Sequence, residues 1–124
     1  MRRGDIWTVA GGAAYACKPR PAVIIQDDSF DGTDSVTVCA FTTDATNAPL
    51  FRLSVEPNAR NGLRVACRLM VDKIVTVPKS RLGAQIGRLD DADILRLNQA
   101  MLVFLGLAVS PRTKRASGPS KLPS

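Results

Sequence analysis

Short apolar runs bounded by turn-forming residues fill the first two thirds of the sequence, and this pattern restricts the fold more than any other feature. Runs of this kind, either alternating with polar residues or rich in β-branched ones, are typical of β-strands. The predicted strands cover residues 5–9, 22–25, 36–41, 51–55 and 68–77. Asn61 and Gly62 form a strong turn signal before the last strand. The continuous apolar run at 22–25 predicts a strand that is buried on both faces.

The spacing of the apolar residues changes after Asp90 from two residues to that of a helix, about 3.6 residues. The predicted apolar face of this helix consists of Ile94, Leu97, Met101, Phe104, Leu105 and Ala108. Asp90 is a suitable N-cap, and Gly106 lies close to the expected end of the helix. The sequence therefore predicts a mostly β fold: a small, curved, mostly antiparallel sheet or barrel with the C-terminal helix packed on one side.

The length of 124 residues allows one compact domain, which we place at residues 1–109. Residues 110–124 are rich in Ser, Pro, Lys, Arg and Gly and predict a basic disordered tail. Much of the net charge of +6 comes from this tail, so the total charge is only a weak argument for a nucleic-acid partner. The tail either binds nucleic acid or keeps the chain soluble, and we favour solubility.

Histidine is absent, which excludes a Ser-His-Asp triad, a Cys-His pair and a zinc site with histidine ligands. Cys17, Cys39 and Cys67 are odd in number and lack C-x-x-C spacing, so neither a disulfide framework nor a thiolate zinc site is predicted. No apolar run is long enough for a signal peptide or a membrane span. We therefore expect a cytoplasmic protein that uses no metal ion and no other cofactor.

Arg20 is the first candidate for chemistry, because Pro19 and Pro21 restrict the backbone on both sides and present its guanidinium from a stiff base. From the residues alone, a surface arginine at the end of a loop is the favoured interpretation. Thr42 and Thr43 close the predicted strand at 36–41. Such hydroxyls can bind a phosphate oxygen, but threonines at strand ends more often cap backbone groups.

Asp72 is a second candidate within the run at 68–77. The period of two places Arg68, Met70 and Asp72 on one face of this strand and Leu69, Val71 and Lys73 on the other. Asp72 is then either a proton-handling group or one half of a structural ion pair, and the residues leave both open.

Five segments, taken in order, resemble the MazF/PemK (Kid) toxin family: residues 3–7, 18–26, 41–43, 72–77 and 82–89. The most specific of them are Arg-Gly-Asp-Ile-Trp at 3–7 and Arg-Pro-Ala-Val-Ile-Ile at 20–25. The resemblance covers about residues 2–108. It implies the small SH3-like barrel of CcdB/MazF/PemK-type toxins, a homodimer, and the toxin of a type II toxin–antitoxin system.

The resemblance also implies an activity. Family members are metal-independent, sequence-specific endoribonucleases that arrest growth and are bound by a cognate antitoxin, with which they bind DNA. The family's catalytic arginine falls on Arg20 and its catalytic threonine on Thr42. The acidic residue that opens a later strand falls on Asp72, and Lys73 follows it.

One departure concerns the Kid branch, which has an arginine two residues before that acid. This chain has Met70 there, and the nearest basic residue on the same predicted face is Arg68. The acid/base assignment of the Kid branch is therefore not carried over. Arg68, Thr43 and Lys18 remain further candidates for contact with RNA.

The expected nucleophile is the substrate's own 2′-hydroxyl, because the sequence offers neither histidine nor a carboxylate cluster for Mg²⁺. Single-stranded RNA would then yield a 2′,3′-cyclic phosphate and a 5′-hydroxyl, whereas DNA would not react. Arg20 would stabilise charge on the phosphorane, and Thr42 would donate a hydrogen bond to the same phosphate. The loop at 11–18 is expected to flank the RNA and to be displaced or ordered by the antitoxin.

Two other classes of function fit a small barrel of this kind. One is a binding module that holds nucleic acid or a peptide without chemistry. The other is a gyrase inhibitor like CcdB, against which the combination of Arg20 and Thr42 argues.

Overall fold

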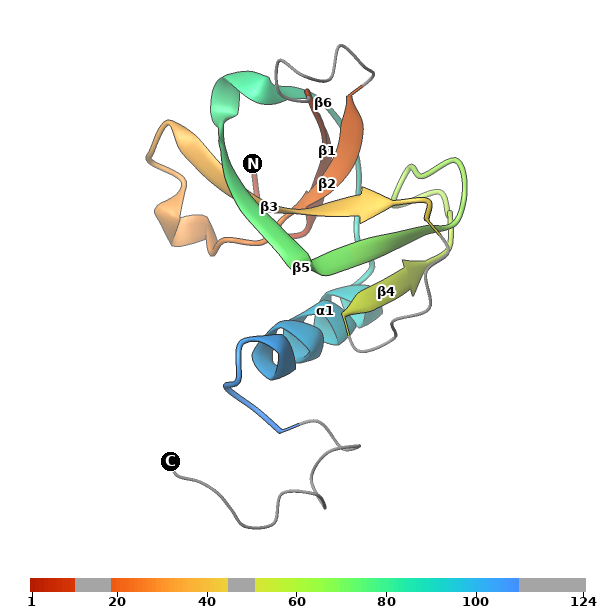
Figure 1. Cartoon of the computed structure of the whole chain (residues 1–124). Helices are drawn as coiled ribbons and strands as arrows, with labels where there is room; N and C mark the ends of the chain where they lie inside the picture. The colour runs from red at the N-terminus through yellow and green to blue at the C-terminus, as the bar shows by residue number, and fades with distance from the viewer. Residues whose placement is uncertain (11–18, 45–50, 110–124) are drawn as a thin grey trace.

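The computed structural model describes residues 1–10, 19–44 and 51–109. Within them, six strands form one antiparallel sheet in the order β4-β5-β3-β2-β1-β6, and one α-helix follows the last strand (Figure 1). The strands are β1 (Asp5–Val9), β2 (Arg20–Ile24), β3 (Ser35–Thr42), β4 (Arg52–Val55), β5 (Cys67–Pro78) and β6 (Leu82–Arg88). The helices are α1 (Asp91–Phe104) and two short 3-10 helices, η1 (Asp28–Phe30) and η2 (Lys79–Arg81). The predicted mostly β fold with a C-terminal helix is confirmed.

Two clusters of buried apolar side chains lie on opposite faces of β2. Val23 belongs to the first cluster together with Leu69 and Leu97, whereas Ala22 and Ile24 belong to the second. Helix α1 packs on β4 and β5 and covers the first cluster (Figure 1). The strand predicted from its continuous apolar run is therefore buried on both faces.

The hairpin of β2 and β3 brings two distant residues together. Its register pairs Ala22 with Ala40, and the ladder ends there. Because the strands are antiparallel, the same register extended by two residues sets Arg20 opposite Thr42. On its other side Arg20 still pairs with Val9 of β1. Arg20 and Thr42 thus lie at the open end of the hairpin, where β2 and β3 separate.

The predicted alternation along β5 is wrong beyond Val71. Cys39 of β3 pairs with Ile74 of β5, and the next pair is Phe41 with Leu69. These two pairs are two residues apart along β3 but five residues apart along β5. A bulge of this kind bends a strand and changes the direction of its side chains. Lys73 was predicted on the same face as Leu69 and Val71, but it leaves that core face and lines a pocket.

Helix α1 buries less of its predicted apolar face than the spacing indicated. Ile94, Leu97 and Met101 pack in the core, but Phe104 is 46% exposed and Leu105 is 60% exposed. The helix ends at Phe104, because Gly106 adopts a φ of +79° and donates its backbone N–H to the Val103 carbonyl at 3.1 Å. Leu107 N–H completes this Schellman motif with a 2.8 Å bond to the Leu102 carbonyl. Leu105 and Ala108 therefore lie beyond the helix.

Asp90 precedes the helix as predicted, but its side chain does not cap it. Its carboxylate instead accepts a 2.9 Å hydrogen bond from Asn58 Nδ2. No helix within the described ranges is long and apolar enough to cross a membrane. The predictions for residues 11–18, Cys17 and Lys18 among them, and for the tail at 110–124 lie outside the described residues.

Candidate active site

Arg20 and Thr42 lie on the wall that separates two pockets. The valine pocket, of about 530 Å³, is lined at one end by Val9, Val38, Val75 and Val77. The loop pocket, of about 470 Å³, is lined by part of the β4–β5 loop, including Arg64 and Val65. Arg20, Pro21, Phe41 and Thr42 line both. A ligand that contacts Arg20 and Thr42 can therefore extend into either pocket.

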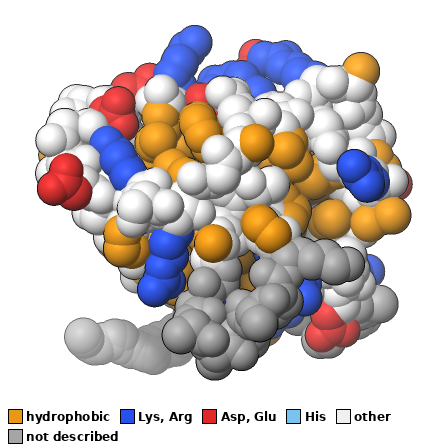
Figure 2. Space-filling view, turned by 90° about the horizontal axis from the view of Figure 1, so that it is seen from above, with side chains coloured by type: hydrophobic (Ala, Val, Ile, Leu, Met, Phe, Trp, Pro, Cys, Tyr) orange, Lys and Arg blue, Asp and Glu red, His pale blue; other side chains and the backbone are white. Residues whose placement is uncertain are grey.

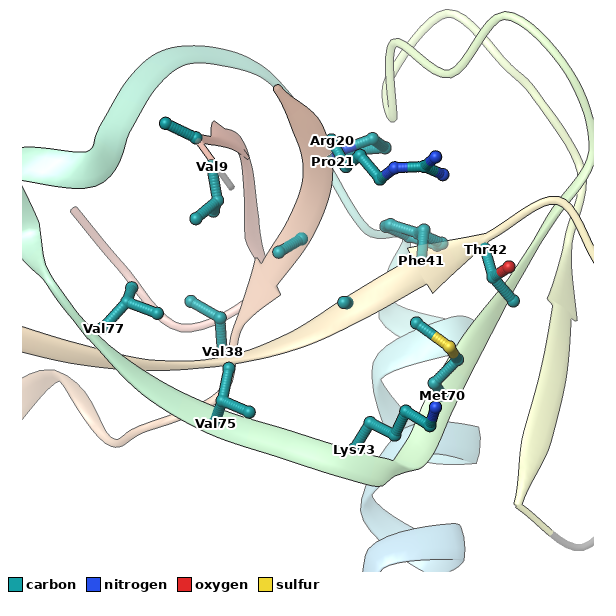
Figure 3. A pocket seen from close by; sticks show the side chains of 13 residues that line it. Val9, Arg20, Pro21, Val38, Phe41, Thr42, Met70, Lys73, Val75 and Val77 are labelled. Carbon is teal, nitrogen blue, oxygen red and sulfur yellow. The ribbon is translucent and has the colours of Figure 1, made fainter. Parts of the chain in front are cut away.

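The valine pocket has an apolar end and a polar end (Figure 3). The four valines occupy one end, whereas Arg20, Thr42, Met70 and Lys73 surround the other. From above, apolar side chains gather in the middle of the molecular face, and Lys and Arg side chains lie around them (Figure 2). Such a mixture suits a nucleotide, because the base has an apolar ring face and the phosphate is anionic.

Thr42 is arranged as a hydrogen-bond donor. Its Oγ1 accepts a 3.1 Å bond from the backbone N–H of Asp44, so the hydroxyl hydrogen is left to point elsewhere. Arg68 pairs with Thr42 across the β3–β5 ladder and donates from Nη1 to the Asp44 carbonyl at 3.1 Å. Arg68 thereby holds the turn that orients Thr42, from a position where its side chain is half-buried.

Arg20 is exposed, and its side chain makes no hydrogen bond or ion pair with any residue that the structure describes. Several other arginines are paired with carboxylates, among them Arg52 with Asp72 and Arg88 with Asp5. Among the described residues that line the two pockets there is no carboxylate. The charge of Arg20 is therefore available to an anionic ligand.

Asp72 forms an ion pair with Arg52 and not with Arg68. The Nε and Nη2 atoms of Arg52 donate to the two carboxylate oxygens of Asp72 at 3.0 Å and 3.2 Å. These hydrogen bonds lower the pKa of Asp72, and the nearby charges of Arg52 and Lys73 act in the same direction. Arg52 also lies 5.8 Å from the centre of the Phe51 ring. Asp72 is thus ionised at neutral pH and committed to a bidentate pair.

A family model described as the PemK-like, MazF-like toxin of type II toxin–antitoxin systems matches residues 2–105. The chain belongs to this toxin family. A probable endoribonuclease MazF of Mycolicibacterium smegmatis is 55% identical to it over 108 residues, which are 87% of this chain and 99% of that protein. The family resemblance of the sequence is therefore confirmed.

Solved structures of MazF toxins have the same fold as this toxin. The Mycobacterium tuberculosis toxin MazF-mt6 aligns with a TM-score of 0.71 at 26% identity, covering 84% of this chain and 98% of that one. A mycobacterial endoribonuclease in complex with its cognate antitoxin aligns with a TM-score of 0.73 at 22% identity, covering 89% and 99%. The second likeness, at this identity, concerns the fold alone.

The toxin's predicted site residues that the structure describes fall into four groups, according to the pockets that they line. Arg20 and Thr42 line both pockets, Lys73 lines only the valine pocket, and Thr43 lines only the loop pocket. Arg68 and Asp72 line neither and act on their neighbours instead. Their roles in catalysis and RNA binding remain predictions, as does that of Lys18, which lies outside the described residues.

Sequence reasoning missed Arg52 and Arg64. The alternation of the run at 51–55 gave no reason to pair Arg52 with a residue 20 positions away. Arg64 is a basic residue two positions after the Asn61-Gly62 turn signal. This position was the only indication in the sequence that Arg64 belongs to the site. Its place in a pocket depends on how the loop packs against the sheet.

Thiol chemistry finds no support in the described part of the toxin. Burial raises the pKa of Cys39 to about 12 and also raises the pKa of Cys67. Both thiols are therefore protonated at neutral pH, and the thiol is a poor nucleophile. Among the described residues, no group of three Cys, Asp or Glu side chains is placed to hold a metal ion.

Proposed function

We propose that this toxin is a metal-independent endoribonuclease that cleaves single-stranded RNA by attack of the substrate's own 2′-hydroxyl. The bond from the 2′-oxygen to the neighbouring phosphorus forms, and the bond from phosphorus to the 5′-oxygen breaks. The 2′-hydroxyl loses a proton to solvent and the leaving 5′-oxygen gains one. The products are a 2′,3′-cyclic phosphate and a 5′-hydroxyl, and a deoxyribose at this position blocks the reaction.

The observation that carries the proposal is the placement of Arg20 and Thr42 on one wall, with donors that no described residue occupies. Charge on the phosphoryl oxygens increases as the 2′-oxygen attacks. Preorganised donors directed at that charge stabilise the transition state more than the ground state. Arg20 provides a forked cation, and Thr42 provides an oriented hydroxyl.

Asp72, on which the family's acidic position falls, has a different role in this proposal. Asp72 holds Arg52 and thereby braces β4 against β5. An ionised carboxylate in a bidentate ion pair cannot donate a proton to the leaving oxygen. We assign Asp72 to positioning of the strands and not to acid catalysis.

The proposed partners follow from the relatives. One solved relative is described as an endoribonuclease in complex with its cognate antitoxin, and we assign this toxin a cognate antitoxin as well. We also assign it a homodimer, because Leu102, Phe104 and Leu105 at the end of α1 are exposed apolar side chains. Light scattering that gives the mass of a single 13.3 kDa chain at micromolar concentration would contradict the dimer. The cytoplasm, where its messenger RNA substrate resides, is the proposed location.

The test is incubation with a long single-stranded RNA in EDTA. We expect discrete fragments that end in a cyclic phosphate, and we expect Arg20→Ala to lose this activity at an unchanged melting temperature. Arg60→Ala is the matched control, because Arg60 is also exposed but lines neither pocket. Cleavage by Arg20→Ala at the wild-type rate would refute the site.

Two further outcomes would identify a different function. RNA binding without any cleavage, in EDTA or with Mg²⁺, would make the chain a binding module. Inhibition of plasmid supercoiling by gyrase without RNA cleavage would make it a gyrase inhibitor of the CcdB kind.

A further inference from the structure

The β4–β5 loop at residues 56–66 is built around one buried polar side chain. Asn61 is fully buried, and its Nδ2 donates to the Glu56 carbonyl at 2.8 Å. Its Oδ1 accepts from the backbone N–H groups of Asn58 and Leu63, both at 3.0 Å. All the hydrogen-bonding groups of this amide except one N–H are thus used to fix the loop. A loop held in this way keeps its shape before a ligand arrives.

The same loop is pressed against β6. A Cβ atom added at Gly62 would lie 2.0 Å from the Ile86 carbonyl oxygen, and one added at Gly87 would lie 2.3 Å from the Asn61 backbone. The Arg60 carbonyl also accepts the backbone N–H of Arg88 at 2.9 Å. These contacts fix the position of the loop relative to the sheet.

This rigid loop presents Arg64 to the loop pocket. Arg64 and Val65 line that pocket, and no carboxylate occurs among its described lining residues. Arg64 is exposed and makes no hydrogen bond or ion pair within the described part of the chain. Val65 beside it is 55% exposed. An unpaired guanidinium next to an apolar side chain matches the phosphate and the base of one nucleotide.

The loop pocket shares Arg20 and Thr42 with the valine pocket, so an RNA whose scissile phosphate lies at Arg20 continues directly into it. We propose that Arg64 binds a phosphate that flanks the scissile one, and that the loop pocket is the subsite for the adjacent nucleotide. The proposal rests on the endoribonuclease function proposed above. It adds a residue that holds the substrate in register and that has no direct contact with the reacting atoms.

The test combines a variant with a modified substrate. The cleavage site is first mapped on a transcript, and short RNAs are then made in which the phosphate on one side or the other of that site is a neutral methylphosphonate. We expect Arg64→Ala to raise KM about tenfold, as for loss of a charge-assisted hydrogen bond, and to leave kcat within about threefold. One of the two methylphosphonates should weaken wild-type cleavage by a similar factor. The same methylphosphonate should not weaken cleavage by Arg64→Ala any further, because the interaction with that phosphate is already lost.

Binding supplies a second readout. The RNA with a single deoxyribose at the cut position should bind Arg64→Ala about tenfold more weakly than wild type, and the slope of log Kd against log salt should fall by roughly 0.7. Arg64→Lys should recover the salt slope and part of the affinity, because it keeps the charge but not the fork. Arg60→Ala, in the same loop but outside the pocket, is the control and should bind like wild type.

The outcomes separate this proposal from the function on which it rests. If Arg20→Ala is inactive but Arg64→Ala shows wild-type KM and Kd, the endoribonuclease stands and the subsite is refuted. If both methylphosphonates reduce cleavage by Arg64→Ala as much as they reduce it for wild type, the subsite is likewise refuted. If Arg20→Ala cleaves normally, the proposed catalytic site itself fails.

Discussion

Thr42 offers a single hydrogen to the substrate, and its contribution can be isolated from its effect on the fold. We expect Thr42→Val, which keeps the shape but removes the hydroxyl, to reduce the single-turnover cleavage rate about a hundredfold, the loss of roughly 3 kcal/mol seen when a preorganised donor is deleted. Thr42→Ser keeps both the donor and the acceptor for Asp44 N–H and should stay within about tenfold of wild type. Thr76→Val is the control, because Thr76 is an exposed threonine of β5 that lines neither pocket. A fully active Thr42→Val protein would remove Thr42 from the mechanism.

The placement of Arg20 and Thr42 was predictable from the sequence because it depends on local rules. Proline on both sides marks Arg20 as the entry to a strand, and Thr42 follows a run of β-branched residues. Two consecutive antiparallel strands joined by a turn bring the start of one beside the end of the other. The sequence did not decide whether Asp72 forms an ion pair, because its partner Arg52 lies on another strand and no local rule connects the two residues.

The pair of Arg52 and Asp72 makes a prediction about stability. The side chains are only 13% and 23% exposed, so we expect Asp72→Asn to lower the free energy of unfolding by about 1 kcal/mol at pH 7. Because the pKa of Asp72 is lowered in the folded state, its contribution is present above about pH 4 and is lost as the pH falls through the folded-state pKa. Urea unfolding at pH 7 and pH 3 should therefore show a smaller difference between wild type and variant at pH 3.

Asp34→Asn is the matched control for this measurement. Asp34 is exposed, and no side-chain hydrogen bond or ion pair joins it to another described residue. Its replacement should change the free energy of unfolding by less than about 0.5 kcal/mol. Equal effects of the two substitutions at pH 7 would show that the ion pair contributes nothing specific.

The β4–β5 loop depends on two glycines that permit close contact with β6. Gly62 has a φ of +70° and faces the Ile86 carbonyl oxygen, which an added Cβ would approach to 2.0 Å. We expect Gly62→Ala to lower the free energy of unfolding by about 2 kcal/mol or more, from backbone strain together with the clash. Gly32→Ala has no atom within 4 Å of the added Cβ and should be close to neutral. Urea unfolding curves compare the two variants, and equal stabilities would contradict the packing described for the loop.

Strand β5 and helix α1 show where periodicity stopped being informative. The alternation of β5 failed at its bulge, because the step of five residues against two is set by pairing with β3 and not by the residues of β5. The helical spacing continued through Leu105 and Ala108, but the left-handed Gly106 ended the helix first. Gly106 indicated the end of the helix in the sequence, whereas no residue of β5 indicated the bulge.

The order of the strands in the sheet could not be determined from the sequence. The five predicted strands reveal neither that a further strand, β6, pairs with β1 nor that β4 lies outside β5. That arrangement brings the loop at 56–66 against β6 and so places Arg64 in the loop pocket. Because the position of Arg64 depends on three segments that are distant in sequence, the local pattern singled out Arg20 as a candidate but not Arg64.

The absence of histidine from the whole chain makes a prediction about the pH dependence of cleavage. An imidazole is the side chain whose ordinary pKa produces an inflection near pH 6.5. Asp72 has a lowered pKa and is ionised throughout this range, whereas Cys39, with its pKa raised to about 12, is protonated throughout. We therefore expect a plot of log kcat/KM against pH without an inflection between pH 5.5 and 7, measured at constant ionic strength in EDTA. A bell centred there would require a titrating acid and base, and a mechanism in which Arg20 and Thr42 act only as donors to the phosphate would then be wrong.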